Sequence, residues 1–154
     1  MHVHVLNGVN LGMLGTREPD VYGKMALNEL ESRVYAWARE LGLTARCMQT
    51  DHEGEYIQAI HEAIRTAGAL IVNPGAWTHY SYAIRDALAM LSTPIVEVHM
   101  SDVNNREPWR RISVIEDVVA KRIVGQGVDG YRLGLEWLAA WSPAEAQLAP
   151  TDPL

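Results

Sequence analysis

Short apolar segments typical of β-strands alternate along the chain with longer segments that carry apolar residues at helical spacing. The strand-like segments cover residues 2–6, 43–49, 68–73, 94–98 and 118–124, and the helical ones cover residues 26–41, 51–67, 80–91 and 128–140. Strands that alternate with helices usually form a parallel sheet with helices on both faces. The sequence therefore predicts an α/β fold, a doubly wound five-stranded parallel sheet with strand order 2-1-3-4-5.

Apolar residues three or four positions apart should face the core in three of these helices. They are Leu27, Leu30, Val34 and Trp37 in the first, Tyr56, Ile57, Ile60 and Ile64 in the second, and Tyr131, Leu135 and Leu138 in the last.

The connection between the first strand and the first helix is unusually long. It covers residues 6–23, LNGVNLGMLGTREPDVYG, whereas compact α/β proteins use about two to six residues there. Long ordered loops are often lids or binding loops. This one contains Asn10, Arg17 and Tyr22, and a guanidinium close to a phenol favours the phenolate. We interpret the loop as the carrier of a general base, and the alternative is a solvated arginine beside a tyrosine that only packs.

Composition limits the class of protein and its partners. The chain has 154 residues, 48% hydrophobic and 21% charged, which predicts one domain with a full core. We expect a single catalytic domain over residues 1–141 and a disordered, proline-rich tail over residues 142–154. A formal net charge of -6 argues against nucleic-acid and membrane-surface partners. It leaves an anionic small molecule open, because a local arginine cluster can outweigh the overall sign.

Cysteine, lysine and apolar runs restrict compartment and chemistry further. Cys47 is the single cysteine, so no intrachain disulfide can form, and a cytoplasmic location fits. We find no signal peptide and no apolar run of about eighteen residues that would span a membrane. Lys24 and Lys121 are the two lysines, on a polar loop end and in a predicted strand, and neither position favours catalysis through an imine.

Polar residues cluster directly after the first, third and fourth predicted strands, whereas the opposite ends of the strands carry mostly turn residues. The clusters contain Asn7, Asn10, Arg17 and Tyr22, then Asn73 and His79, then Glu97, His99, Met100 and Ser101, with Arg106 and Arg110 following. In doubly wound sheets, ligands bind outside the carboxyl ends of the strands. The sequence therefore predicts a site at this edge.

A second catalytic candidate in these clusters is His99. Glu97 precedes it by two residues, so both side chains lie on the same face of a strand. A carboxylate there could orient the ring and keep it cationic, as a general acid requires. The alternative is a structural histidine that ends a strand.

The remaining candidates have simpler alternatives. Asn73 ends a buried strand and needs hydrogen-bond partners, and Thr78 could cap the helix that follows His79. Backbone N–H groups at Met100 and Ser101 could form an anion site, or Met100 could simply fill space. Asp86 lies next to Arg85 on a helix, where an ion pair on a solvated face is the plainer interpretation.

No motif for a metal or a cofactor is evident. The glycines at 8, 12 and 15 match neither the dinucleotide-binding nor the P-loop spacing, and the histidines lack a convincing metal-ligand spacing. We therefore expect neither a metal nor a cofactor, and we interpret Cys47 as a small buried residue.

Taken together, the motifs resemble those of the type II 3-dehydroquinate dehydratases. They are LNGVNLGMLGTREPDVYG at 6–23, VNPGAWTHYSYAIRDAL at 72–88, EVHMSD at 97–102, REPWR at 106–110 and GYRLGL at 130–135. The resemblance covers residues 2 to about 140. It implies a flavodoxin-like fold and a homododecamer built as four trimers. It also implies anti elimination of water from 3-dehydroquinate to give 3-dehydroshikimate, without metal or cofactor.

The resemblance also implies roles for individual residues. Tyr22 would be the base, with Arg17 stabilising its phenolate. Asn10 would hold a water against the enolate, and His99, oriented by Glu97, would protonate the departing hydroxyl. Asn73, His79, Met100, Ser101 and Arg110 would bind the substrate. Asp86 would reach into the site of a neighbouring subunit.

Some positions depart from the pattern of that family. Val9 stands where the family usually has proline, Asn104-Asn105 replaces a pair such as His-Ala, and Ile112 replaces a common histidine. These departures leave open a paralogue that dehydrates a relative of the substrate, such as an amino analogue. A non-catalytic flavodoxin-like module is the alternative from a different class of protein.

Overall fold

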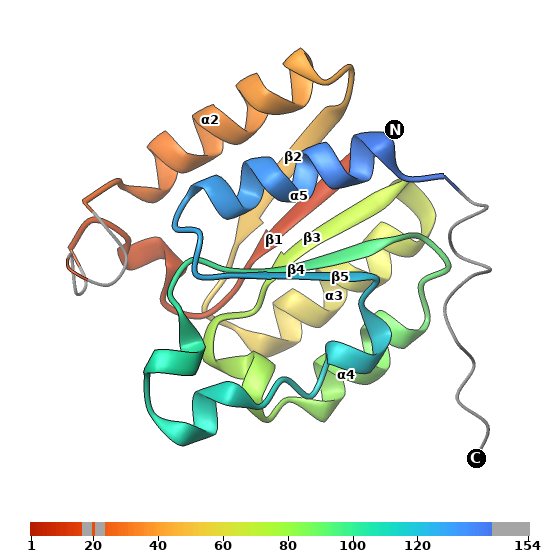
Figure 1. The fold of residues 1–154 in the computed structure, drawn as a ribbon. Helices are drawn as coiled ribbons and strands as arrows, with labels where there is room; N and C mark the ends of the chain where they lie inside the picture. The colour runs from red at the N-terminus through yellow and green to blue at the C-terminus, as the bar shows by residue number, and fades with distance from the viewer. Residues whose placement is uncertain (17–19, 21–23, 143–154) are drawn as a thin grey trace.

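The computed structural model describes residues 1–16, 20 and 24–142. Its strands are β1 (His2–Asn7), β2 (Thr44–Gln49), β3 (Ala69–Asn73), β4 (Ile95–His99) and β5 (Lys121–Val124). They pair in parallel in the order β2-β1-β3-β4-β5, which confirms the predicted fold class and strand order. Figure 1 shows α2 (Leu27–Glu40) and α5 (Asp129–Ala140) on one face of the sheet and α3 (Glu53–Thr66) and α4 (Tyr82–Ala89) on the other.

Side chains of the central strands point alternately to the two faces and form two hydrophobic cores. Val3 and Val5 of β1 pack on the α2 and α5 side, while Leu6 at the end of the same strand packs on the α3 and α4 side. Every residue of β3 and of β4 is buried. The two central strands, covered on both faces, provide a rigid base from which the loops at the carboxyl edge project.

The loops that follow β1, β3 and β4 contain short 3-10 helices. They are η1 (Leu11–Met13), η2 (Gly75–His79), η3 (Val103–Asn105) and η4 (Pro108–Arg111), and a further one, η5 (Glu116–Val118), precedes β5. The fifth strand is therefore shorter than predicted. Val118 and Val119 pack against the α3 and α4 core, and strand pairing begins only near Ala120, whose N–H donates to Ile95 O at 2.8 Å. A short apolar run looks the same in a turn as in a strand.

The predicted inward faces of the helices are confirmed with one exception. Ile64 in α3 is 44% exposed, and Ala63 is buried instead. Each step of four residues rotates about 40° beyond a full turn, so that two steps after Tyr56 the side chain has left the core face.

Among the described helices, none combines the length and the apolar character needed to cross a membrane. The predicted disordered tail lies outside the described residues from position 143 onward. A single domain over residues 1–141 stays a prediction.

Candidate active site

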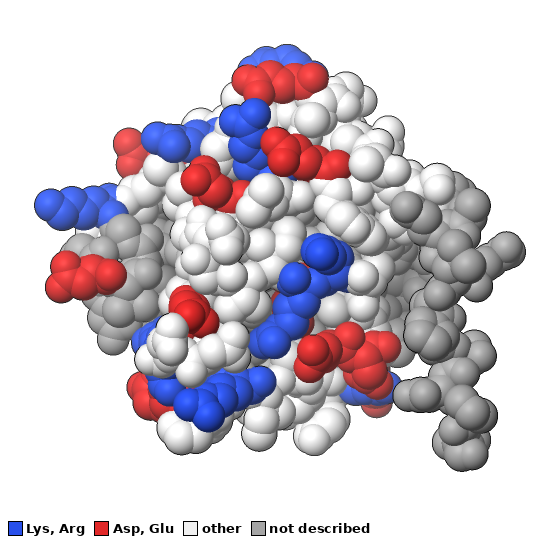
Figure 2. Space-filling view, in the orientation of Figure 1, with Lys and Arg blue, Asp and Glu red and all other residues white. Residues whose placement is uncertain are grey.

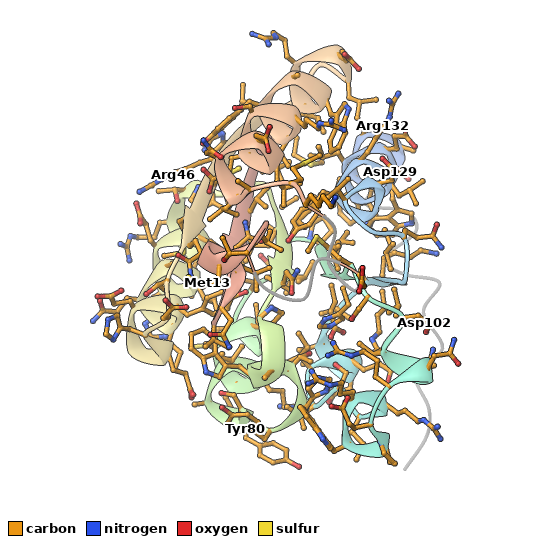
Figure 3. The ribbon with its side chains drawn as sticks, turned by 90° about the vertical axis from the view of Figure 1, so that its left-hand side faces the viewer. Met13, Arg46, Tyr80, Asp102, Asp129 and Arg132 are labelled. Carbon is orange, nitrogen blue, oxygen red and sulfur yellow. The ribbon has the colours of Figure 1, made fainter. Side chains whose placement is uncertain are left out.

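A pocket lies at the carboxyl ends of the central strands, where the strand order reverses between β1 and β3. Figure 3 looks onto this edge, where the labelled Met13, Tyr80 and Asp102 lie on three different loops around its centre. Polar residues predicted from separate parts of the chain line the pocket together with apolar residues of the first loop. The polar ones are Asn10, Asn73, Ser101, Arg106 and Arg110. Met100 also lines it, so residues that follow β1, β3 and β4 do meet at this edge.

The start of the first loop is held in a strained conformation. Asn10 has a φ of 67°, a left-handed conformation that asparagine tolerates better than most residues. Its N–H donates to Asp51 Oδ1 at 2.8 Å, and Gln49 Nε2 donates to the same oxygen at 3.1 Å. A Cβ on Gly8 would lie 2.5 Å from Pro74 O, so the loops after β1 and β3 touch backbone to backbone. These contacts fix Asn10 at the rim of the pocket.

Asn73 belongs to a buried hydrogen-bond network that joins the core on the α2 and α5 side to the pocket. Its Nδ2 donates to the Tyr131 hydroxyl at 2.9 Å, and that hydroxyl donates to Asn7 Oδ1 at 2.7 Å. Asn7 and Asn73 are register partners at the ends of β1 and β3. Gly75 N–H donates to Asn73 Oδ1 at 3.3 Å. The expectation that Asn73 needs partners is confirmed, and these partners orient its amide.

His99 and Glu97 form a buried pair at the end of β4. His99 Nε2 lies 2.6 Å from Glu97 Oε1, with the carboxylate fully buried and the histidine 6% exposed. Burial raises the pKa of Glu97, but hydrogen bonds and charge from His99, with smaller contributions from Thr78 and Arg122, outweigh it. The net effect lowers the pKa below its usual value, so Glu97 is a carboxylate at neutral pH. The structure thus confirms that Glu97 holds the ring of His99.

Three further side chains surround this carboxylate. Thr78 donates its hydroxyl to Glu97 Oε1 at 2.5 Å, and Ser113 Oγ lies 3.0 Å from both carboxylate oxygens. Arg122 Nε lies 3.3 Å from Glu97 Oε2. The predicted cap at Thr78 is therefore wrong. Residues Gly75–His79 form a 3-10 helix, α4 begins three residues later, and Ser81 caps it by accepting from Ile84 N at 3.1 Å.

His79 lies beside His99 with a defined tautomer. Its Nδ1 is 2.6 Å from Ile112 O, and because a carbonyl only accepts, Nδ1 carries the hydrogen. Burial lowers the pKa of His79 despite that hydrogen bond. Its ring stacks on that of His99 with centroids 6.3 Å apart and meets Trp109 edge-on at 5.1 Å. Nε2 of the neutral ring has no hydrogen-bond partner among the described residues, so it can accept a hydrogen bond from a ligand.

The charge of the pocket is positive although the chain is acidic overall. Arg106 and Arg110 line it, and no described acidic residue does. Arg110 donates to Glu107 at 2.6 Å and lies 4.2 Å over the Trp109 ring, which fixes its direction. Arg106 is a lining residue that was not singled out as a ligand from the sequence. Its spacing of four residues from Arg110 was the available signal. An anionic small molecule fits this environment.

Comparison with known proteins agrees with this geometry. The sequence model of the family "Dehydroquinase class II" matches residues 1–139. The chain belongs to the class II dehydroquinase family. A relative from Leptothrix cholodnii named 3-dehydroquinate dehydratase is 49% identical over 136 residues, 88% of this chain and 91% of the relative. One of the same name from Syntrophotalea carbinolica is 52% identical over 134 residues, 86% of this chain and 90% of the relative.

Solved structures agree with the family assignment. The type II dehydroquinase from Propionibacterium acnes has a TM-score of 0.89 and 44% identity, covering 91% of this chain and 97% of that one. A 3-dehydroquinate dehydratase-like protein from Bifidobacterium longum has a TM-score of 0.67 and 31% identity, covering 90% and 95%.

The positions that depart from the family pattern differ in their relation to the pocket of this class II dehydroquinase. Val9 lines it directly. Asn104 and Asn105 follow β4, and both donate to the carboxylate of Asp102. Ile112 is 60% exposed, and its contribution near the pocket is the backbone carbonyl that holds His79.

Several predicted site residues are not among the residues that line this pocket. His79, Glu97 and His99 lie at the ends of η2 and β4 without lining it. Arg17 and Tyr22 lie outside the described residues. Asp86 does not line the pocket; its side chain is 78% exposed and pairs with Arg85 at 3.1 Å. Within one subunit of this class II dehydroquinase, Asp86 therefore matches the interpretation of a solvated ion pair, and its role as a ligand for a neighbouring site stays a prediction. No group of three His, Cys, Asp or Glu side chains that could hold a metal ion occurs among the described residues.

Proposed function

We propose that this class II dehydroquinase removes water from 3-dehydroquinate to give 3-dehydroshikimate. The observation that carries the proposal is the buried pair of Glu97 and His99 beside a pocket lined by Arg106 and Arg110. The substrate is a carboxylate with a ketone and several hydroxyls, which suits a pocket with two arginines and amide groups. The names of the relatives support the same reaction.

The reaction needs one base and one acid on two sides of the substrate ring. Tyr22, as a phenolate stabilised by Arg17, takes the proton α to the ketone, and the electron pair moves into an enolate. Asn10 holds a water against the enolate oxygen. The enolate then collapses, the carbon–oxygen bond breaks, and His99 gives its proton to the departing hydroxide, which leaves as water. Each proton transfer contributes roughly 10²–10⁴-fold.

Binding of the substrate falls to groups from the end of β3 and from the segments that follow β3 and β4. Arg110, with Arg106, pairs with the carboxylate, and the N–H groups of Met100 and Ser101 add to the anion site. Asn73 and the free Nε2 of His79 hydrogen-bond the ring hydroxyls. These assignments are supported by the lining of the pocket and by the hydrogen bonds that orient Asn73 and His79.

The assembly belongs to the same proposal. We infer a cytoplasmic homododecamer, a tetramer of trimers, with one catalytic domain per chain over residues 1–141 and no metal or cofactor. The carboxylate of Asp86 is exposed although it pairs with Arg85, so it is accessible to a neighbouring subunit. Sedimentation of the purified protein measures the assembly directly.

An absorbance assay tests the reaction. Purified protein at micromolar concentration is mixed with 3-dehydroquinate, and the conjugated enone of the product is followed in the ultraviolet. Tyr22→Phe and His99→Ala should each lower kcat at least about a hundredfold. The exposed Tyr82→Phe and His61→Ala serve as matched controls and should keep wild-type turnover.

Two results would contradict the assignment. Comparable turnover in Tyr22→Phe or His99→Ala would remove that residue from its role. Absence of an enone signal with 3-dehydroquinate, combined with turnover of its amino analogue, would favour the paralogue, and absence with both would favour a non-catalytic protein.

A further inference from the structure

Glu97 contacts a second cation besides His99. Arg122 comes from β5, where it is the register partner of Glu97, so both side chains lie on the same face of the sheet. Arg122 Nε lies 3.3 Å from Glu97 Oε2, whereas His99 Nε2 contacts Oε1. The arginine side chain is 19% exposed, and its Nε and Nη2 atoms are buried without a hydrogen bond to any described residue. The contact is therefore one of charge more than of directed hydrogen bonding.

The charges of this cluster change with the protonation of His99 alone. While the ring is protonated, it neutralises the buried carboxylate. Once the ring has released its proton, a carboxylate with no other cation would be an unpaired buried charge, which is costly, and Glu97 would hold the proton back. A guanidinium keeps its charge at every pH of interest. Arg122 thus neutralises the carboxylate of Glu97 when the ring of His99 is neutral.

Other titratable or charged groups that face the pair do not supply this charge. His79 on η2 stacks on His99, and burial lowers its pKa, so it is neutral at neutral pH. Tyr56 on α3 is buried, and burial raises its pKa. Arg110 on η4 pairs with Glu107. Figure 2 shows basic side chains over β5 with acidic ones beside them, but among the described residues only His99 and Arg122 lie within ion-pair distance of Glu97.

We propose that Arg122 is a positioning residue that keeps Glu97 ionised in both protonation states of His99, so that the ring can release its proton while still held by the carboxylate. The inference rests on the proposed function, in which that proton leaves with the hydroxyl of the substrate. The contact of Arg122 is with Glu97, on the side of the carboxylate away from His99, so it acts through Glu97 and not on the substrate.

The test compares Arg122→Met with two matched variants in the full-length protein. Arg122→Lys keeps a positive charge at the same place, and Lys121→Met removes the exposed cation next to it on β5. The pH at which Glu97 and His99 together release their shared proton is measured by NMR of the histidine ring without substrate. In Arg122→Met this pH should rise by about one unit or more. Arg122→Lys and Lys121→Met should titrate like the wild type.

Kinetics give a second reading of the same property. The protonated ring is the active acid, so turnover falls at high pH as the pair loses its proton. In Arg122→Met this fall in kcat should occur at a higher pH, shifted by the same amount as the NMR midpoint. The plateau of kcat in Arg122→Met should fall about tenfold, because the proton is released less readily, while KM changes little. Arg122→Lys should restore kcat.

An unchanged titration of Arg122→Met would overturn the proposal and leave Arg122 a packing residue. If Arg122→Met does not fold, Arg122→Gln replaces it with the same expectation. If neither folds, a ¹³C label on the Glu97 carboxylate in the wild type decides: the proposal requires an ionised carboxylate at every pH where His99 is neutral. Lack of turnover in the wild type would refute the proposed function, yet it would leave the NMR titration as a valid test of Arg122.

Discussion

Replacing Tyr131 by phenylalanine removes a single oxygen atom, yet it should be strongly destabilising. The hydroxyl is fully buried between Asn73 and Asn7, accepting from the first at 2.9 Å and donating to the second at 2.7 Å. Its removal leaves two buried amide groups short of a partner, and each costs about 1–3 kcal/mol. We expect a loss of about 2–6 kcal/mol in the free energy of unfolding. A loss near 3 kcal/mol corresponds to a fall of roughly 6–12 °C in Tm.

Tyr56 provides a matched control for this prediction. It is equally buried, but its hydroxyl donates only to Leu6 O, at 3.0 Å. Tyr56→Phe should cost about 0.5–1.5 kcal/mol. Urea unfolding followed by tryptophan fluorescence, at one protein concentration because an oligomer ties stability to concentration, gives both values. A cost for Tyr131→Phe no larger than that for Tyr56→Phe would refute the reasoning. Because Asn73 lines the pocket, we also expect kcat/KM to fall about tenfold in Tyr131→Phe alone.

Three further predictions concern conformation, pH and reactivity. Gly75 has a φ of 64°, and a Cβ there would lie 2.7 Å from Val9 O. Gly75→Ala should therefore lower the free energy of unfolding by about 2–4 kcal/mol, as measured by thermal melting. Gly42 has a similar φ of 71° but open space around it, so Gly42→Ala should cost clearly less. The pKa of Glu97 is lowered in the folded state, so its contribution to stability is full above about pH 4.5 and is lost as the pH falls through the folded pKa. If the free energy of unfolding falls with acid as steeply in Glu97→Gln as in the wild type, this reasoning is wrong. Burial raises the pKa of Cys47 to about 12, so iodoacetamide at pH 8 should label the native thiol about a thousandfold more slowly than the urea-unfolded one, and similar rates would refute it.

The fold and the pair at the end of β4 follow from local rules. Alternation of short apolar runs with helical faces specifies the parallel sheet, and a spacing of two residues puts Glu97 and His99 on one face of a strand. Both depend only on the geometry of single elements, so both could be predicted from the sequence. The position of the pocket follows from the strand order, because this order places the loops after β1, β3 and β4 at one edge.

The residues around Glu97 could not be predicted in the same way, because they come from separate elements. Thr78 precedes a helix, where threonine usually caps, but the 3-10 helix η2 turns its hydroxyl toward Glu97. Ser113 lies in a loop with no recognisable motif. Arg122 lies in a short edge strand, and its contact depends on the register of β5 against β4. A pairing across strands is set by tertiary packing, which one sequence does not encode in any local pattern.

The position of Arg122 also bears on how the acid can be reused. A histidine that donates its proton must regain one before the next turnover, so both states of the ring have to be held in the same place. A carboxylate held by hydroxyls and a pH-independent cation achieves this, since Thr78, Ser113 and Arg122 contact Glu97 through atoms that do not involve the ring. The orientation of His99 is then a property of the folded chain and not of its own charge. Loss of the arginine should therefore affect the release of the proton before it affects the position of the ring.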